Sequence, residues 1–324
     1  MEQFGNYVLI RRLAQGGMSE VFEAQRMNAP PGSPPLVLKR LLPELEGRAD
    51  VVDMFLTEAD VTTMLRHPNI VQVYESGEFY GRYYMVMEMM DGPDLSDVQR
   101  ASIEQGVGIS MAVAIYVCIQ ALRGLDYVHQ ARSPSSGRPF GIIHRDISPE
   151  NLFCSLAGQV KVADFGIAKL SALEGFTSLN VGVKGKLSFM APEQIRGEPL
   201  DGRTDEFAVG LVLYELCTGR RAYYVAPGET EVDLMERVKD AKFVKPRKVE
   251  GEIPRRLQNA MLKALERKPG NRFKTCGEFA DELVDVARKE ALEANASHMH
   301  ALLRELFPQR FQRPPTAAPV ASRA

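Results

Sequence analysis

Three oxygen-bearing side chains that could carry out phosphoryl transfer lie close together in the sequence. Asp146 and Asn151 belong to His-Arg-Asp-Ile-Ser-Pro-Glu-Asn at 144–151, and Asp164 opens Asp-Phe-Gly at 164–166. Phosphoryl transfer needs one carboxylate that accepts the proton of the attacking hydroxyl, and separate oxygen ligands that hold Mg²⁺ on the nucleotide phosphates. We expect Asp146 to accept the proton, and Asn151 and Asp164 to bind the metal. The alternative is a turn followed by a strand in which the acidic residues are scattered by chance. The surrounding segments decide between this alternative and a phosphoryl-transfer site.

Two segments nearer the N-terminus could bind phosphates. Leu-Val-Leu-Lys at 36–39 is typical of a strand that ends in a lysine. A helix is predicted over 51–65, because apolar residues recur there with helical spacing: Val52, Phe55, Leu56, Ala59 and Leu65. Glu58 lies inside this helix and is the candidate partner of Lys39. The glutamates of the proline-containing segment 43–46 are weaker candidates.

A glycine-containing turn lies between two predicted strands, at 9–13 and 21–24. Its sequence is Ala-Gln-Gly-Gly-Met-Ser at 14–19. A glycine pair more often marks a plain hairpin turn, but a strand, a turn and a second strand are also what a flap over phosphates requires. Ser19 could donate its backbone N–H with less freedom in φ than a glycine has. We therefore expect a working but stiffer phosphate flap.

In this order, the segments resemble those of the bacterial eukaryotic-like serine/threonine protein kinase family, over about residues 7–286. The resemblance implies an α+β, two-lobed protein-kinase-like fold with ATP in the cleft. The small N-lobe, residues 1–90, would hold a five-stranded antiparallel sheet and one main helix. The larger, helical C-lobe would cover residues 91–286, with the apolar stretch 111–122 as its central helix.

The resemblance also implies which residues would bind ATP and Mg²⁺. Lys39 would reach the α- and β-phosphates, held in place by Glu58. Met87 would be the gatekeeper beside the adenine, and backbone groups of Glu88 and Met90 would bond the edge of the base. The flap and the walls around the adenine would be supplied by Leu13, Ala14, Gly16, Gly17, Met18, Ser19, Val21, Val37 and Phe153.

Two supporting interactions follow from the same resemblance. Asp205, near the start of a helix expected over 206–218, matches the aspartate that steadies the catalytic loop. Glu193, in Ala-Pro-Glu at 191–193, would pair with Arg272.

Several residues depart from the family pattern. The flap keeps only the middle glycine, Gly16. Ser148 stands where serine/threonine kinases usually have a lysine that contacts the γ-phosphate, and Lys186 stands where they have a threonine. We hypothesise that these two positions have exchanged roles, so that Lys186 supplies positive charge near Asp146. A solvated loop lysine at 186 is the alternative. Phe189 replaces the commoner tyrosine.

These departures leave alternatives open. The main expectation is a protein kinase, acting in bacterial signalling, that transfers the γ-phosphate of ATP to a protein hydroxyl, with Ser/Thr favoured. A tyrosine or dual-specificity kinase and a pseudokinase scaffold are the other readings. A non-enzymatic module would leave five polar residues at active-site spacing unexplained.

A regulatory hypothesis concerns Arg145, which directly precedes the catalytic aspartate. Kinases with this arginine are often switched by a phosphate on the activation segment. Thr177 and Ser178 lie in the middle of that segment, and a phosphate there could pair with Arg145 and Lys169. Ordinary loop hydroxyls are the alternative.

Composition sets broader limits on the class of protein. The chain has 324 residues, 45% of them hydrophobic, which is enough for two lobes with a sizeable core. A net charge of -2 implies no general attraction to nucleic acid or membranes. Four cysteines without a C-x-x-C pair fit reduced core residues of a cytoplasmic protein. No apolar run comes near the roughly 20 residues that span a bilayer.

Segments outside the core are expected at three places. Pro and Gly residues at 28–35 predict an exposed loop, and 131–139 predicts a surface insertion, with a docking loop as the alternative. Residues 287–308 are expected to form an additional helical segment, whose apolar face would comprise Met299, Leu302, Leu303 and Leu306. This face would pack on its own domain or receive a regulatory partner. The tail at 309–324 is expected to be disordered, since it has no acid and several prolines.

Overall fold

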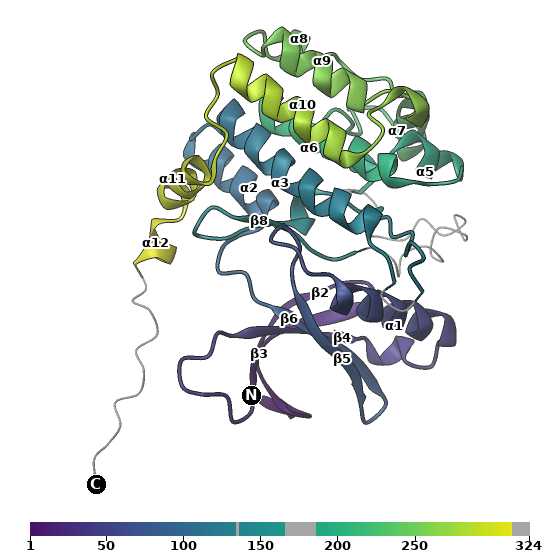
Figure 1. Ribbon diagram of the computed structural model, residues 1–324, viewed down its shortest axis with the longest axis vertical. Helices are drawn as coiled ribbons and strands as arrows, with labels where there is room; N and C mark the ends of the chain where they lie inside the picture. Colours follow the sequence, from purple (N-terminus) through teal and green to yellow (C-terminus); the bar gives the residue numbers. More distant parts are fainter. Residues whose placement is uncertain (134–135, 166–185, 313–324) are drawn as a thin grey trace. The chain divides into compact units, whose positions relative to one another are not determined.

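A computed structural model of the chain describes residues 1–133, 136–165 and 186–312, with only the backbone of Lys186 (Figure 1). The chain forms two compact units. The first comprises Met1–Arg66, Val71–Asp91 and the described residues from Phe307 on, and the second comprises His67–Ile70 and Gly92–Leu306. The change from one unit to the other at Asp91 lies next to the expected boundary. Residues 287–306 belong to the second unit.

The first unit is an antiparallel sheet with one long helix. The strands are β1 Glu2–Phe4, β2 Tyr7–Gln15, β3 Ser19–Arg26, β4 Leu36–Leu41, β5 Val73–Phe79 and β6 Arg82–Glu88, in the order β1-β2-β3-β4-β6-β5. The short helix η1 Pro43–Leu45 leads into α1 Ala49–Met64, and α12 is Pro308–Phe311. The predicted fold class is confirmed, but the expected five strands were wrong by one, because β1 was not anticipated.

Strand β1 is held by an aromatic cluster and by a buried arginine. The ring of Phe4 lies 5.1 Å from that of Phe79 in an edge-on contact. Arg40, which is 4% exposed, lies over the rings of Phe4 and Phe22. Its guanidinium also pairs with Glu2 and Glu20, each at 2.8 Å. A buried charge with several partners is stable where a lone one would not be, so these contacts fix β1 to the sheet.

The second unit is mostly helical, and a small two-stranded sheet, β7–β8, carries the predicted metal ligands. Its described elements are α2 Leu95–Gln105, α3 Met111–Gln130, η2 Pro149–Asn151, β7 Leu152–Cys154, β8 Val160–Val162, η4 Lys186–Phe189, α5 Pro192–Arg196, α6 Gly202–Thr218, α7 Glu231–Lys239, α8 Pro246–Val249, α9 Arg255–Ala264, η5 Pro269–Asn271, α10 Cys276–Lys289 and α11 Ala296–Leu306. Side-chain oxygens cap the first turns of α2, α3 and α6.

Helix α3 lies at the centre of this unit and packs against α6 and α10. It is longer than the apolar stretch 111–122 suggested. By length and composition alone α3 could cross a membrane, yet most of it is buried inside the unit, as is usual for the core helix of such a fold. Gln120 does not interrupt it, because its amide oxygen accepts a hydrogen bond from Asn69 at 2.8 Å.

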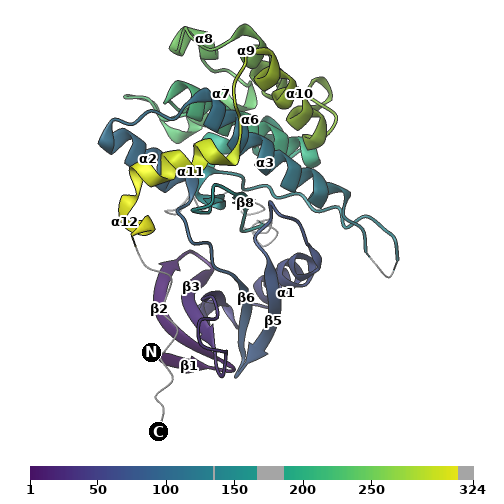
Figure 2. The ribbon, with the colours of Figure 1, turned by 60° about the vertical axis from the view of Figure 1, so that its left-hand side comes forward.

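The C-terminal residues are more ordered than expected. Helix α11 packs against α2 and α3 (Figure 2), and its apolar face is buried at all four predicted positions. Residues 309–311 belong to α12, so the expectation of disorder was wrong there, and 313–324 lie outside the described residues. A regulatory partner at α11 stays a prediction, and such a partner would have to bind another face or displace the helix.

The two expected surface segments connect elements as predicted. The loop 28–35 joins β3 to β4 and is largely exposed. In the insertion 131–139, Arg132 and Pro139 form an isolated antiparallel bridge, so its ends come together.

Candidate active site

The predicted proton acceptor and one predicted metal ligand are joined directly. The amide nitrogen Nδ2 of Asn151 donates to the backbone oxygen of Asp146 at 2.6 Å and to its carboxylate Oδ2 at 3.2 Å. Asn151 is 8% exposed and ends helix η2. Because its nitrogen faces Asp146, its amide oxygen is the atom left for a cation. One side chain therefore orients the carboxylate and presents a metal ligand.

The backbone of the catalytic loop is fixed by a buried aspartate. Asp205, in the first turn of α6, accepts backbone N–H groups of His144 at 2.8 Å and Arg145 at 2.7 Å. His129 Nε2 lies 2.7 Å from the same carboxylate. Burial is the largest influence and would raise the pKa of Asp205, but His129, His144 and the backbone N–H of Arg145 together outweigh it and the pKa is lowered. Asp205 thus stays ionised, as its expected supporting role requires.

Asp164 follows β8 and is positioned through its neighbours. The backbone N–H of Ala163 donates to the backbone oxygen of Asn151 at 2.9 Å, so the two predicted metal ligands are brought near each other. His144 Nε2 donates to the carbonyl of Ala163 at 2.9 Å, and its ring contacts buried Phe165. Asp164 itself has φ +54°, a strained value that persists only where the surroundings enforce it.

The predicted phosphate-binding pair lies in the first unit. Lys39 Nζ on β4 is 3.3 Å from Glu58 Oε1 on α1, and the two side chains are 15% and 6% exposed. Across the sheet Val21 lies directly opposite Lys39, and Val37 opposite Met87. Directly opposite residues share a face of a sheet, so the expected phosphate and adenine residues of these strands are grouped as predicted.

The predicted flap is the hairpin between β2 and β3. Leu13, Ala14 and the residues up to Ser19 lie in it, and the backbone N–H of Gly16 donates to the carbonyl of Ser19 at 2.8 Å, closing the turn. A Cβ added at Gly17 would meet nothing within 4 Å. The backbone around Gly17 can therefore be approached closely, which suits a phosphate.

The remaining residues that the sequence predicts around the adenine are divided between the two units. Glu88 ends β6, and its backbone N–H donates to the carbonyl of Gln72 at 2.9 Å. Met90 follows the strand in the first unit, whereas Phe153 lies on β7 in the second.

The hypotheses about the activation segment fall largely outside the described residues. The residues outside the described part of the chain include Lys169, Thr177 and Ser178, and the side chain of Lys186 is not described either. Ser148 is 6% exposed. Nε and Nη1 of Arg145 are buried, and among the described residues they have no hydrogen-bond partner. Burial lowers the pKa of Arg145.

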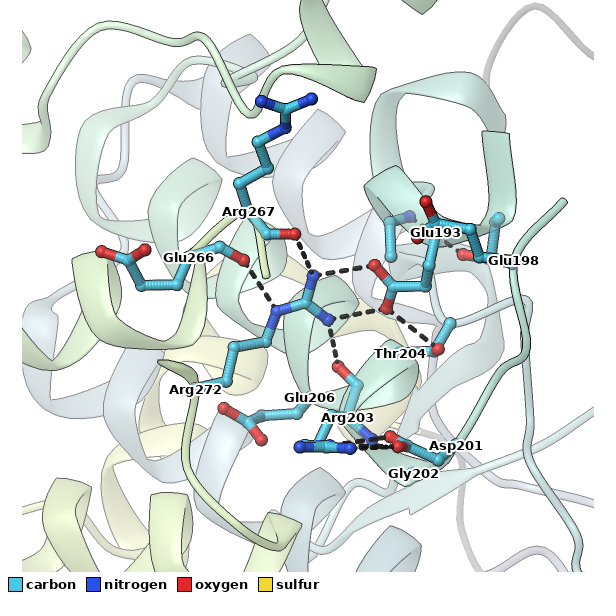
Figure 3. A network of polar contacts seen from close by, with 12 residues as sticks. Glu193, Glu198, Asp201, Gly202, Arg203, Thr204, Glu206, Glu266, Arg267 and Arg272 are labelled. Atoms are coloured by element: carbon cyan, nitrogen blue, oxygen red, sulfur yellow. Dashed lines mark hydrogen bonds and ion pairs between the residues drawn. The ribbon is translucent and has the colours of Figure 1, made fainter. Parts of the chain in front are cut away.

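The expected ion pair between Glu193 and Arg272 is present and fully buried (Figure 3). Arg272 donates to both carboxylate oxygens of Glu193, at 2.7 and 2.8 Å, and the side chains are 0% and 2% exposed. The same guanidinium donates to the carbonyls of Glu266 and Arg203, each at 2.8 Å. Thr204 donates to Glu193 at 3.0 Å. Every charge-bearing group of the pair is thereby bonded.

Two contributors to the site were not anticipated from the sequence. Gln194 donates through Nε2 to the carbonyl of Arg145 at 2.9 Å and accepts the N–H of Ala191 at 2.9 Å, which ties α5 to the catalytic loop. His129 completes the partners of Asp205. Neither residue carries a local pattern that could have revealed its long-range partner.

The donor atoms fit Mg²⁺ held together with nucleotide phosphates. Among the described residues, no group of three or more His, Cys, Asp or Glu side chains could hold a metal by itself. Mg²⁺ is usually bound by one or two carboxylates while waters and phosphate oxygens complete its shell. Asn151 and Asp164 supply oxygen ligands of this kind.

Comparison with known proteins agrees with this geometry. The chain is 38% identical over 307 residues to "Tyrosine-protein kinase MasK" of Myxococcus xanthus, covering 95% of this chain and 47% of that protein. It is 33% identical over 281 residues to "Serine/threonine-protein kinase PknJ" of Mycobacterium tuberculosis, covering 86% and 44%. The chain thus spans about half the length of the curated relatives it matches.

Solved structures and family models point the same way. The crystal structure of the Mycobacterium tuberculosis PknI kinase domain matches with a TM-score of 0.64 and 26% identity, over 88% of this chain and 97% of that one. The model of the protein kinase domain family matches residues 7–286. With this family match and the arrangement of Asp146, Asn151 and Asp205, the chain belongs to the protein kinase domain family.

Proposed function

We propose that this chain is an active protein kinase domain that transfers the γ-phosphate of ATP to a hydroxyl group of a protein. The observation that carries the proposal is the carboxylate of Asp146, oriented by Asn151 in a loop whose backbone Asp205 holds. In the kinase family this aspartate accepts the proton of the substrate hydroxyl. A pseudokinase scaffold would not need this carboxylate to be oriented.

The other residues have distinct tasks in this proposal. Asn151 and Asp164 would hold Mg²⁺, which neutralises charge on the phosphates when it is bound. Lys39, positioned by Glu58, binds the α- and β-phosphates, and the β2–β3 hairpin covers them with its backbone.

We propose Ser/Thr as the main acceptor, because relatives such as PknJ carry that activity in their names. Tyrosine is the second candidate. The 38% identical relative is named a tyrosine kinase, and Ser148 departs from the usual serine/threonine pattern.

The deciding experiment is transfer of radiolabelled γ-phosphate from ATP to a generic protein substrate, followed by acid hydrolysis and identification of the phosphoamino acid. Transfer that depends on Mg²⁺ and is lost in Asp146→Asn supports the proposal. No transfer by the wild-type chain, with nucleotide binding retained, favours the pseudokinase. Phosphotyrosine as the main product favours the second candidate.

We further propose that Lys186 replaces the missing lysine at position 148. Removing a preorganised charge-stabilising donor costs about 10²–10³ in kcat, so Lys186→Ala should fall in that range. Ser148→Lys alone should impair the enzyme, and adding Lys186→Thr should restore activity. Additive effects in this double-mutant cycle would reject the exchange.

We propose that the domain works in the cytoplasm. All four cysteines are free and buried, which fits a reducing compartment. Fractionation of cells that make the protein would test this, and recovery outside the cytoplasm would reject it.

A further inference from the structure

Helix α11 lies beyond the residues that the family model matches, yet it contacts the hairpin that carries the predicted metal ligands. The match ends at residue 286, whereas α11 spans Ala296–Leu306. Both views of the ribbon place α11 beside α2 (Figures 1 and 2), and both elements belong to the second unit.

The contact is close and polar at the turn between β7 and β8. A Cβ added at Gly158 would come within 2.2 Å of the carbonyl of Ala296, and Gly158 has φ +86°. Only glycine fits this position. Two residues earlier, the carbonyl of Leu156 lies 2.7 Å from His300 Nδ1. A carbonyl can only accept, so Nδ1 carries the proton and donates it. Backbone contact and hydrogen bond together fix the turn against α11.

The turn between β7 and β8 is also held by a contact with α3 and by a hydrogen bond within the turn. Tyr116 on α3 donates its hydroxyl to the carbonyl of Gly158 at 3.0 Å. The backbone N–H of Ser155 donates to the carbonyl of Gln159 at 2.8 Å, closing the hairpin. α11 therefore contacts a small, rigid body rather than a free loop.

The other end of this hairpin is the predicted metal site. Strand β7 begins directly after Asn151, and β8 ends two residues before Asp164. The strands have three residues each, so the turn lies only about 10 Å from the metal ligands. A shift of the turn would be transmitted along the paired strands to the hydrogen bond between Ala163 and Asn151.

We propose that α11 is a positioning element for the metal site, and that His300 is its key positioning residue. This inference rests on the proposed kinase function. The four apolar residues of α11 are buried and pack the helix against its unit. The hydrogen bond from His300 is additional, and it acts on the turn rather than on the helix that carries it.

The test uses two conservative variants of the whole chain. An asparagine can place an N–H where Nδ1 of the histidine lies, whereas a glutamine places it near the position of Nε2. His300→Asn should therefore keep the hydrogen bond to Leu156, and His300→Gln should lose it. The control is His298→Ala on the exposed side of the same helix, where the histidine ring lies near its neighbours Asn295 and Glu293.

Two quantities are measured for each variant. The first is the increase in ATP affinity caused by Mg²⁺, from calorimetric titrations with and without the ion. The second is hydrogen exchange of the amides of Val162 and Ala163, which lie between the turn and Asp164. Loss of an outer partner of a metal ligand typically costs 10–100-fold in metal affinity. Since His300 acts from farther away, we expect His300→Gln to reduce the Mg²⁺ effect about 3–10-fold and to speed this exchange.

The outcomes separate the inference from the proposed function. The positioning role is supported if His300→Asn and His298→Ala behave like the wild type. His300→Gln must then show both a smaller effect of Mg²⁺ on ATP affinity and faster hydrogen exchange. Equal behaviour of all three variants overturns it. If only His300→Gln failed to fold, the bond would be needed for folding rather than positioning, which also overturns it. If ATP affinity of the wild type did not depend on Mg²⁺, the proposed function would fail, while hydrogen exchange would still test the coupling of α11 to the hairpin.

Discussion

The two units fix the predicted site residues that each contains by different means. In the first unit, Lys39 and Glu58 meet in a contact of 3.3 Å between a strand and a helix. That helix, α1, begins at Ala49, and the side chain of the preceding residue, Arg48, does not cap it. In the second unit, the backbone around Asp146 is bonded by a buried carboxylate and by a buried amide. The catalytic part is therefore fixed from several directions, whereas the phosphate-binding part can adjust by movement of one helix.

This difference indicates where control can act on such a domain. A group that is fixed by several buried hydrogen bonds moves only if the bonds break together, at a high free-energy cost. A group that is held by an ion pair between a strand and a helix, as Lys39 is, changes position when that helix shifts. We expect substitutions in the second unit to damage catalysis or folding, and substitutions at the Lys39–Glu58 pair to change nucleotide use.

The largest effect is expected at the proton acceptor. Asp146→Asn keeps the shape of the side chain but removes the base, and general-base help is typically worth about 10²–10⁴-fold. We expect kcat to fall by that factor while ATP affinity stays within a few-fold, measured by steady-state kinetics and titration. A variant that retained half of the wild-type kcat would show that Asp146 is not the acceptor.

The buried ion pair should dominate the stability of the second unit. Arg272→Met leaves the carboxylate of Glu193 buried without its main partner, and breaking such a pair costs about 3–5 kcal/mol. The matched control is Arg203→Met, whose ion pair with Asp201 is partly exposed and should contribute about 0–1 kcal/mol. Urea unfolding of both variants measures the difference. Equal losses would mean that burial of the Arg272 pair is not what stabilises the unit.

Glu206 is one of several side chains of the second unit with a buried polar atom that has no hydrogen-bond partner among the described residues. It is fully buried, its Oε2 has no hydrogen-bond partner among the described residues, and burial raises its pKa to about 8 from 4.5. An acid whose pKa is raised on folding is stabilising while protonated, so this contribution is lost as pH rises from about 4.5 to 8. The change is on the order of 2–5 kcal/mol.

Glu206→Gln keeps the hydrogen-bond acceptor for Phe273 and cannot ionise, so its stability should not show this fall. Denaturant unfolding at pH 5, 6.5 and 8 compares it with the wild type and with Glu266→Gln, an exposed control. Parallel pH profiles for the wild type and Glu206→Gln would show that Glu206 is already ionised in the folded state at pH 5.

The smallest effect on stability is expected at the phosphate-binding pair. Glu58→Gln retains an acceptor for Lys39 but loses its charge, so we expect about a tenfold drop in kcat/KM for ATP, which corresponds to about 1.4 kcal/mol. The free energy of unfolding should fall by less than in Arg272→Met, because the glutamine still accepts a hydrogen bond from the Lys39 ammonium. A loss of stability as large as that of Arg272→Met would contradict the contrast between the units.

The sequence predicted the fold class and the grouping of the catalytic residues, for physical reasons that can be stated. Asp146, Asn151 and Asp164 lie on one turn and one short hairpin, so their spacing alone limits their separation. The pairing of Glu193 with Arg272, 79 residues apart, came only from the family resemblance. Strand β1 was missed because three residues are too few to show a period.

Other contacts had no signal in the local pattern. Gln194, His129 and His300 act on backbone or side-chain groups that are distant in the sequence, and their types are equally common on exposed surfaces. The apolar face of α11 was visible from its helical spacing. Its position against α2 and α3 required the three-dimensional structure.

The contact between His300 and Leu156 also sets an order of events during synthesis. The two residues are 144 positions apart, and chains are made at roughly 5–20 residues per second from the N-terminus. The hairpin with Asn151 and Asp164 therefore leaves the ribosome roughly 7–29 s before its partner helix. Throughout that interval the carbonyl of Leu156 must bond to water. A nascent chain thus carries Asp146, Asn151 and Asp164 before it carries α11, so the contact between the hairpin and α11 can form only after late residues are translated.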